Sequence, residues 1–113
     1  MRKELYDTNV LIDLWGKKKR DVTGYTTILN IIEFPKALLM PNLIILYPTI
    51  DDLNEAVKIS KKLMEIGKPV GAVDIVVACI AIRNNLNLVT MDSDFENIKL
   101  VKPEFNVTVI KEY

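Results

Sequence analysis

The sequence contains no histidine, and its only cysteine among 113 residues is Cys79. Without histidine the chain cannot build a Ser-His-Asp or Cys-His catalytic arrangement. A histidine-bearing zinc site is excluded for the same reason, and one cysteine cannot supply a thiolate zinc site. General base chemistry must therefore come from carboxylates, lysine or metal-bound water.

The chain also lacks an excess of either charge and lacks a long hydrophobic run. Lys plus Arg and Asp plus Glu number 15 each, so the net charge does not indicate a nucleic-acid-binding protein. The longest apolar run, residues 75–82, is far shorter than the roughly 20 residues of a membrane span. No segment resembles a signal peptide, and a lone cysteine favours a reducing compartment. We therefore expect a cytoplasmic protein that does not enter a membrane.

Strand and helix patterns alternate along a chain whose length fits a single domain, residues 1–113. This alternation indicates an α/β fold with a largely parallel sheet. The strands at 43–47 and 87–90 are apolar enough to be buried on both faces. Pro35 should kink or divide the second helix, and residues 92–97 should form a loop or a single turn. The patterns predict strands at 3–6, 43–47, 87–90 and 107–110, and helices at 8–15, about 26–38, 51–66 and 73–83.

Four acidic residues adjoin apolar segments, where a charge is costly unless it is paired. Asp7 and Asp92 each follow a predicted strand, so both should lie at the carboxyl edge of the sheet. Glu33 interrupts an apolar helix, Asp74 precedes the longest apolar run, and Asp94 offers a fifth carboxylate. We expect these side chains to converge on Mg²⁺ or Mn²⁺, which prefer oxygen ligands. Such ions can activate water and clamp a phosphate, so the pattern favours metal-dependent phosphodiester cleavage.

Each acid also has a simpler explanation. Asp7 could cap a helix, Glu33 could be a solvated helix residue, Asp74 could serve the helix dipole, and Asp92 could form a turn. A metal-dependent phosphatase or a receiver domain also gathers acids at a sheet edge. A receiver would carry an acidic pair beside the first strand and a lysine after a late strand, and neither feature is present. The combination of all four acids favours a shared site.

Two further features remain open between function and structure. The basic block Lys17-Lys18-Lys19-Arg20 could contact RNA phosphates or could be a solvated loop. The apolar faces of segments 35–40 and 52–64 could bind a partner or a second subunit, or could belong to the core.

Four blocks of the sequence resemble motifs of PIN-domain ribonucleases, in order and in rough spacing, over nearly the whole chain. Residues 7–13, Asp-Thr-Asn-Val-Leu-Ile-Asp, resemble the opening motif of that family. Thr27, six positions before Glu33, resembles the second block. Residues 71–78 resemble the third block, in which an aspartate opens an apolar helix, and residues 88–95 resemble the Thr-x-Asp-x-Asp-Phe block.

The resemblance implies a three-layer PIN-like α/β fold, with a parallel sheet of about five strands flanked by helices. It implies an Mg²⁺- or Mn²⁺-dependent endoribonuclease acting on an RNA substrate. Many such small proteins are VapC-type toxins, usually homodimers that a VapB-type antitoxin inhibits, and we expect the same partners here. The alternatives are a stand-alone PIN nuclease in RNA processing and a catalytically silent PIN-like binding module.

The resemblance also assigns roles to individual residues. Asp7, Glu33, Asp74 and Asp92 match the catalytic acidic quartet, and Asp7, Asp74, Asp92 and Asp94 match positions that hold the metal. Thr8, Asn9, Thr27 and Thr90 match supporting positions around the acids. Two departures stand out: the stretch between Glu33 and Asp74 is short, which predicts a trimmed helical hairpin, and Pro35 should bend the helix that presents Glu33.

Overall fold

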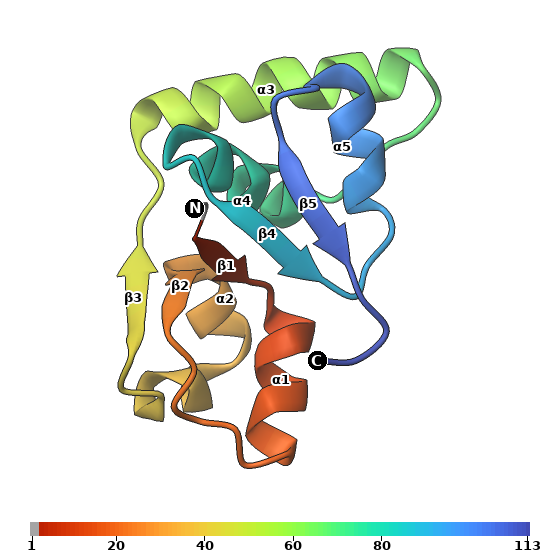
Figure 1. Ribbon diagram of the computed structural model, residues 1–113. Helices are drawn as coiled ribbons and strands as arrows, with labels where there is room; N and C mark the ends of the chain where they lie inside the picture. The colour runs from red at the N-terminus through yellow and green to blue at the C-terminus, as the bar shows by residue number, and fades with distance from the viewer. Residues whose placement is uncertain (1–2) are drawn as a thin grey trace.

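A parallel five-stranded sheet forms the centre of the molecule (Figure 1). The computed structural model describes residues 3–113, so residues 1 and 2 of the predicted domain lie outside the described part. All four strand pairings are parallel, which confirms the predicted sheet type. The strand order is β3-β2-β1-β4-β5, and the strands are β1 Glu4–Tyr6, β2 Gly24–Thr27, β3 Leu43–Leu46, β4 Asn87–Thr90 and β5 Asn106–Val109.

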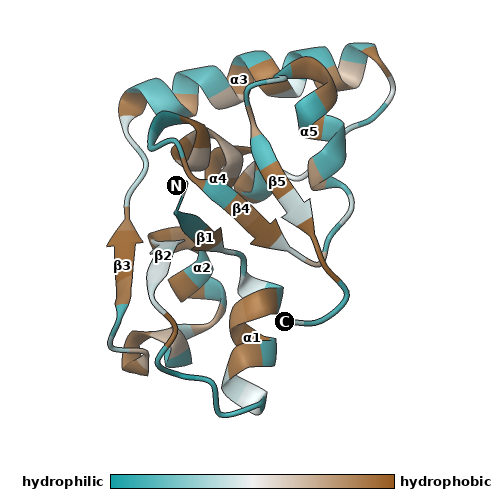
Figure 2. Ribbon diagram, viewed as in Figure 1, coloured by the Kyte–Doolittle hydropathy of each residue, from teal (hydrophilic) through white to brown (hydrophobic). Residues whose placement is uncertain are grey.

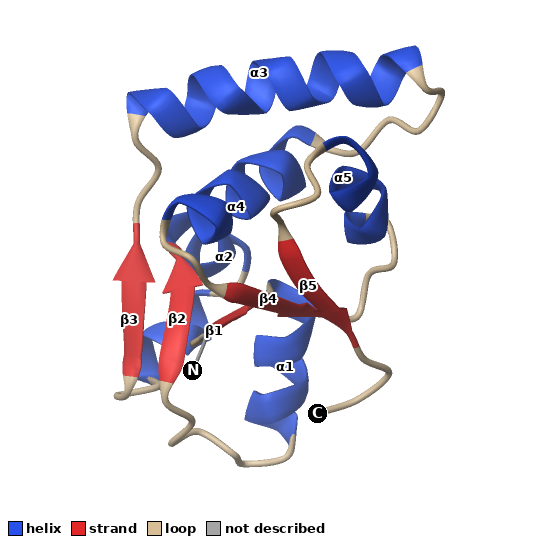
Figure 3. Cartoon of the chain, turned by 45° about the horizontal axis from the view of Figure 1, so that its top comes forward, coloured by secondary structure: helices blue, strands red, loops and turns tan. Residues whose placement is uncertain are grey.

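Helices cover both faces of the sheet, so the α/β three-layer prediction is confirmed (Figures 1 and 3). Side chains of successive strand residues point to opposite faces, and Leu5 and Tyr6 accordingly belong to two separate core clusters. The Tyr6 cluster includes residues of the helices on one face: α1 Thr8–Gly16, α2 Ile28–Glu33 and the 3₁₀ helix η1 Pro35–Leu39. The Leu5 cluster includes residues of the helices on the other face: α3 Ile50–Glu65, α4 Ala72–Arg83 and α5 Phe95–Val101.

Helix α4 is the most deeply buried helix of the fold. Its residues are apolar almost all round, which is typical of a helix enclosed by other elements, and Figure 2 shows the contrast with the largely hydrophilic α3. Cys79 lies within α4 at 3% exposure, as expected for a small core residue. Within residues 3–113, no helix combines the length and the apolar character that a membrane crossing requires.

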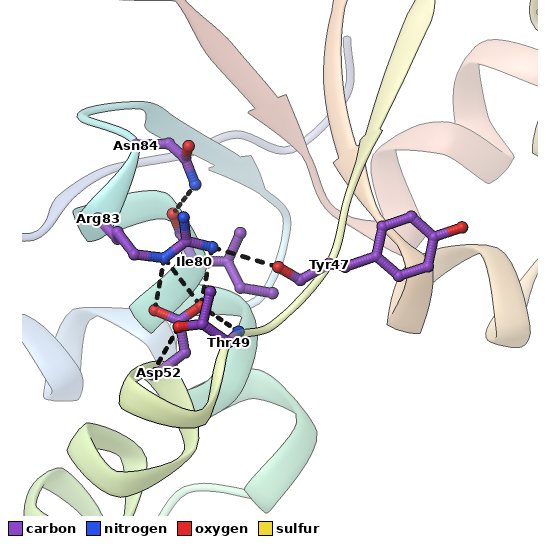
Figure 4. Close-up of polar contacts among 6 residues, drawn as sticks. All are labelled: Tyr47, Thr49, Asp52, Ile80, Arg83 and Asn84. Carbon is purple, nitrogen blue, oxygen red and sulfur yellow. Dashed lines mark hydrogen bonds and ion pairs between the residues drawn. The ribbon is translucent and has the colours of Figure 1, made fainter.

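The N-terminus of α3 is tied to the C-terminus of α4 by a buried aspartate (Figure 4). Asp52, 3% exposed, accepts hydrogen bonds from Arg83 Nε to both carboxylate oxygens, at 2.9 and 3.0 Å. Asp52 also accepts from the backbone N–H of Thr49, the N-cap residue of α3. Arg83 donates in addition to the carbonyl of Tyr47, so this cluster holds the end of β3 and two helices together.

The structure corrects several expectations about individual elements. Strand β3 lies at an edge of the sheet with Ile44 55% exposed, so the expectation of burial on both faces was wrong for it. The helix expected over about 26–38 begins later, because its first residues pair as strand β2. It ends at Glu33, and Pro35 opens η1, so the predicted division at Pro35 is confirmed. Residues 92–97 were expected to be a loop or single turn, but helix α5 begins at Phe95.

Candidate active site

The candidate site lies where β1, β2 and β4 end at the carboxyl edge of the sheet. In the β1–β4 register Tyr6 is opposite Val89, which places Asp7 beside Thr90. The backbone N–H of Asp7 donates to the carbonyl of Val89 at 3.0 Å, so the pairing extends one residue past β1. Parallel strands thus bring together polar residues that are more than 80 positions apart in sequence.

Asp7 is the most enclosed of the five acidic residues predicted for the site, at 6% exposure. Its Oδ1 accepts a hydrogen bond from Asn30 Nδ2 at 3.1 Å, and its Oδ2 accepts one from Thr90 Oγ1 at 2.6 Å. Asp7 occupies the N-cap position of α1, yet its side chain makes no capping hydrogen bond. The carboxylate is therefore directed toward β4 and α2 and does not serve chiefly as a helix cap.

Burial is the main influence on the Asp7 carboxyl and raises its pKa, because desolvation disfavours the charged form. Hydrogen bonding by Thr90, the backbone of Thr8 and the side chain of Asn30 opposes that rise in pKa. The negative charge of Glu33 adds to it. None of these donors is a cation, so no positive charge offsets the buried negative charge of Asp7.

Two side chains connect Asp7 to Glu33. Asn30 Nδ2 donates to Thr8 Oγ1 at 2.9 Å, and Thr8 Oγ1 donates to Glu33 Oε1 at 2.6 Å. Glu33 itself is exposed at the end of α2, and Asn30 is completely buried one turn earlier. Asn30 was not among the predicted site residues. The available signals were its position in the apolar run 28–32 and its spacing three residues after the N-cap Thr27.

The segment after β4 holds Asp92 and Asp94 at the rim of the site. Asn9 Oδ1 accepts from the backbone N–H of Met91 at 3.1 Å, and Thr90 Oγ1 accepts from that of Asp92 at 3.0 Å. Asp92 Oδ1 accepts from the backbone N–H of Asp94 at 2.9 Å. Asp92 therefore forms a turn, which was the alternative to a metal-binding role, and one of its carboxylate oxygens accepts a hydrogen bond within that turn.

Asp74 joins the group from the first turn of α4. Its side chain is half-buried and makes no hydrogen bond or ion pair with the rest of residues 3–113. Burial raises the pKa of its carboxyl to about 6, with further contributions from the charges of Asp7, Asp92, Glu33 and Asp94, in that order. Asp74 thus lies within electrostatic reach of the other four carboxylates.

The five acids offer carboxylate oxygens, which are the ligands that a hard divalent cation prefers. None of the ion pairs within residues 3–113 involves any of the five acids, so no lysine or arginine neutralises them. In the same part of the chain, no three Asp, Glu, His or Cys side chains are close enough together to hold a metal ion as they stand. Like charges without a counterion repel one another. A bound cation would remove that repulsion.

The basic block Lys17-Lys18-Lys19-Arg20 begins at the C-cap of α1, at the opposite end of that helix from its N-cap Asp7. The nine residues of α1 separate the two by roughly 13 Å along the helix axis. Lys17 pairs with Asp13 at 3.1 Å and with Glu112 at 3.2 Å. Arg20 lies over the ring of Trp15, 3.5 Å from its centroid. The structure therefore does not bring this block and the acids into one pocket.

The sequence profile of the PIN domain matches residues 29–100 of this chain. This match includes Glu33, Asp74 and Asp92 and lies C-terminal to Asp7. No curated protein matches the chain.

Solved structures of toxin–antitoxin complexes contain chains with a similar fold. The DNA-bound VapBC from Salmonella typhimurium superposes with a TM-score of 0.76 at 20% identity, covering 96% of this chain and 98% of that one. VapBC-1 from nontypeable Haemophilus influenzae gives 0.72 at 19% identity, over 94% and 96% of the two chains. VapBC2 from Rickettsia felis, bound to a promoter DNA fragment, gives 0.71 at 16% identity, over 94% and 97%. At such identities the likeness shows a shared fold.

Proposed function

The protein belongs to the PIN-domain family, and from that premise we propose that it is an Mg²⁺- or Mn²⁺-dependent endoribonuclease that acts as the toxin of a VapBC-type pair. The observation that carries the proposal is the group of five uncompensated carboxylates at the carboxyl edge of the sheet. A protein gains no stability from such a group, because each charge raises the cost of the others. A cation-binding role explains why the charges are placed together.

In this proposal Asp7, Asp74 and Asp92 would hold the cation, with Asp94 in support. When bound, the cation would supply Lewis-acid activation of water and neutralise charge on the phosphate. The chain itself would do the rest of the chemistry. Glu33 Oε1 is occupied by the Thr8 hydroxyl, which leaves Oε2 to accept a proton from the attacking water. Thr90 and Thr8 would keep the acids in place.

The toxin assignment rests on the fold of the similar chains, because the three solved structures are VapBC complexes. A VapB-type antitoxin is therefore the proposed protein partner, RNA the proposed substrate, and the cytoplasm the proposed place of action. Co-expression with a small protein encoded by a neighbouring gene tests the partner directly. If this small protein neither binds the chain nor inhibits it, a stand-alone RNA-processing nuclease becomes the better description.

A homodimer is also proposed, with the groove between α3 and α4 as the contact between copies. The groove has a volume of about 820 Å³ and is lined mainly by apolar side chains such as Leu53, Val57 and Met64. Lys61 and Glu65 lie on the same groove one helical turn apart. Two copies related by a two-fold axis could pair each lysine with the partner's glutamate. Light scattering of wild type and Val57→Glu tests this, and a wild-type monomer would contradict it.

The decisive test of the proposed function is cleavage of mixed RNA in Mn²⁺ and in EDTA. Wild type should cleave only in Mn²⁺, and both Asp7→Asn and Asp74→Asn should reduce cleavage at least 100-fold, as expected when a metal-binding carboxylate is lost. Asp51→Asn, a change at an exposed aspartate of α3 outside the site, is the matched control and should retain full activity. Cleavage that survives both site substitutions would refute the mechanism. Absence of cleavage by wild type would favour a silent binding module.

A further inference from the structure

Asn30 makes the largest set of side-chain hydrogen bonds in the candidate site, although it carries no charge. It is completely buried in the first turn of α2. Its Nδ2 donates to Asp7 Oδ1 at 3.1 Å and to Thr8 Oγ1 at 2.9 Å. Its Oδ1 accepts from Thr27 Oγ1 at 2.7 Å and from the backbone N–H of Thr27 at 3.2 Å. A side-chain amide has two N–H donors and two acceptor positions, so its capacity is fully used.

These contacts fix the orientation of the amide. The oxygen faces the two donors of Thr27, whereas the nitrogen faces a carboxylate and a hydroxyl that itself donates to Glu33. A rotated amide would set its oxygen against Asp7 Oδ1 and lose the bonds to Thr27. Thr27 in turn is anchored by strand β2 and by the capping box of α2. Asn30 is therefore a rigid donor held by the scaffold.

We propose that Asn30 is a positioning residue, which fixes the Asp7 carboxylate for cation binding and, through Thr8, couples Asp7 to Glu33. The inference rests on the proposed function, since it assumes a cation at Asp7. Thr90, on β4, donates a hydrogen bond to Oδ2 of the same carboxylate. Asn30, after β2, and Thr90 therefore bind its two oxygens from the two strands that flank β1. With either bond removed, the carboxylate could rotate about its last torsion angle.

A neutral amide is suited to this role in a way that a charged donor is not. Lysine or arginine at this position would orient Asp7 but would also neutralise the charge that attracts a cation. Each oxygen of Asp7 accepts one side-chain hydrogen bond, and a carboxylate oxygen can accept about two. The backbone N–H of Thr8 is a further donor to this carboxylate, so Asn30 and Thr90 orient it and leave room for a metal bond on the oxygen that does not accept from Thr8.

The test is a calorimetric titration of Mn²⁺ into wild type, Asn30→Leu and the matched control Asn54→Leu. Leucine branches at the same position as asparagine but is larger and makes no hydrogen bond, and Asn54 lies exposed on α3. We expect the Kd for Mn²⁺ to rise about 10- to 100-fold in Asn30→Leu, the usual effect of losing a residue that orients a metal ligand. The Kd of Asn54→Leu should equal that of wild type.

A second variant, Thr27→Val, tests the inference if Asn30→Leu does not fold. It removes the hydroxyl that holds Asn30 Oδ1 and leaves Asn30 in place, so the Kd for Mn²⁺ should rise in the same direction but less. Circular dichroism shows which variants are folded at the titration temperature. In RNA cleavage the folded variants should need more Mn²⁺ for half-maximal rate, with the KM for RNA unchanged.

The outcomes separate this inference from the proposed function. If wild type binds Mn²⁺ and cleaves RNA while both variants keep the wild-type Kd, the positioning role is refuted and the nuclease stands. If the variants lose Mn²⁺ affinity but wild type does not cleave RNA, the positioning role holds and the nuclease proposal fails. If wild type binds no Mn²⁺, both are overturned.

Discussion

Replacement of Asp74 by asparagine should stabilise the metal-free protein at neutral pH while it removes a proposed metal ligand. Asp74 is half-buried, has no hydrogen-bond or ion-pair partner within residues 3–113, and faces the charges of four other carboxylates. Folding therefore costs free energy whenever Asp74 is ionised. Asparagine has nearly the same shape and carries no charge, so it should avoid most of that cost.

The size and the pH range of the effect follow from the pKa of Asp74. Its carboxyl has a pKa near 3.8 in the unfolded chain and about 6 in the folded protein. The folded state thus binds more protons between these values, and the free energy of unfolding falls as the pH rises from about 4 to about 6. A difference of about 2 pKa units corresponds to about 3 kcal/mol. Because Asp74 is partly exposed and solvent screens its charge, we expect about 1–2 kcal/mol.

Urea unfolding in EDTA at several pH values between 4 and 8 measures this difference. Trp15 is the only tryptophan, and its ring contacts Phe34 with centroids 6.3 Å apart, so its fluorescence should report unfolding. Asp74→Asn should be more stable than wild type at pH 7.5, and the difference should shrink toward pH 4. Asp51→Asn is the control and should lower the free energy of unfolding, because loss of an acid from the first turn of α3 costs about 0.3–1 kcal/mol.

Equal or lower stability of Asp74→Asn at pH 7.5 in EDTA would refute this reasoning. That result would mean that Asp74 does not feel the other carboxylates, and the acids would then not form one electrostatic group. A gain in stability that is the same at pH 4 and pH 7.5 would also contradict it, because the gain would then not depend on ionisation.

Three further predictions test the scaffold and the basic block. Asp52→Ala should lower the free energy of unfolding by about 2–3 kcal/mol in urea, because Arg83 loses its bonds to both carboxylate oxygens; an unchanged midpoint would contradict this. Gly24→Ala should cost about 1–3 kcal/mol, since a Cβ there would lie 2.7 Å from a ring carbon of Tyr6; wild-type stability would show that the ring can move. Because Lys17-Lys18-Lys19-Arg20 lies at the far end of α1 from Asp7, changing it to glutamines should leave RNA binding and its dependence on salt unchanged, and a flatter salt dependence would show that this block contacts phosphates.

The elements that could be predicted from sequence are those with a long or strong apolar pattern. Helix α4 and strand β4 were placed within about one residue, because their burial requires nearly continuous apolar residues. Strand β2 was missed because Gly-Tyr-Thr-Thr has neither alternation nor several large apolar residues. Its pairing with β1 and β3 makes it a strand, and such pairing is a tertiary effect that local sequence does not record.

Two other differences have similar causes. Strand β3 is as apolar in composition as a central strand, but the topology places it at an edge of the sheet. Helix α5 directly follows the turn residues of segment 92–94. These residues favoured the prediction of a loop, although Phe95 and Ile98 form a short amphipathic pattern and are completely buried. Composition thus indicated the kind of element but not its place in the sheet or the point where a turn ends.

The acids of the candidate site could be proposed from sequence because each follows or interrupts an apolar segment. Their partners were harder to find. Asn30 resembles an ordinary helix residue until β2 brings Thr27 and Asp7 together around it. The basic block shows the reverse case, since a charge run close to Asp7 in sequence lies at the far end of α1 in space. Sequence proximity overstated its connection to the site.

The most direct test of the central claim is the melting temperature with and without a divalent cation. If the carboxylates at the sheet edge form a cation site, saturating Mn²⁺ should stabilise wild type, by about 2.7 kcal/mol at 100 times the Kd. This corresponds to a rise of roughly 10 °C for a chain of this size, and Asp7→Asn should abolish it. Identical melting temperatures of wild type in EDTA and in millimolar Mn²⁺ would contradict the claim.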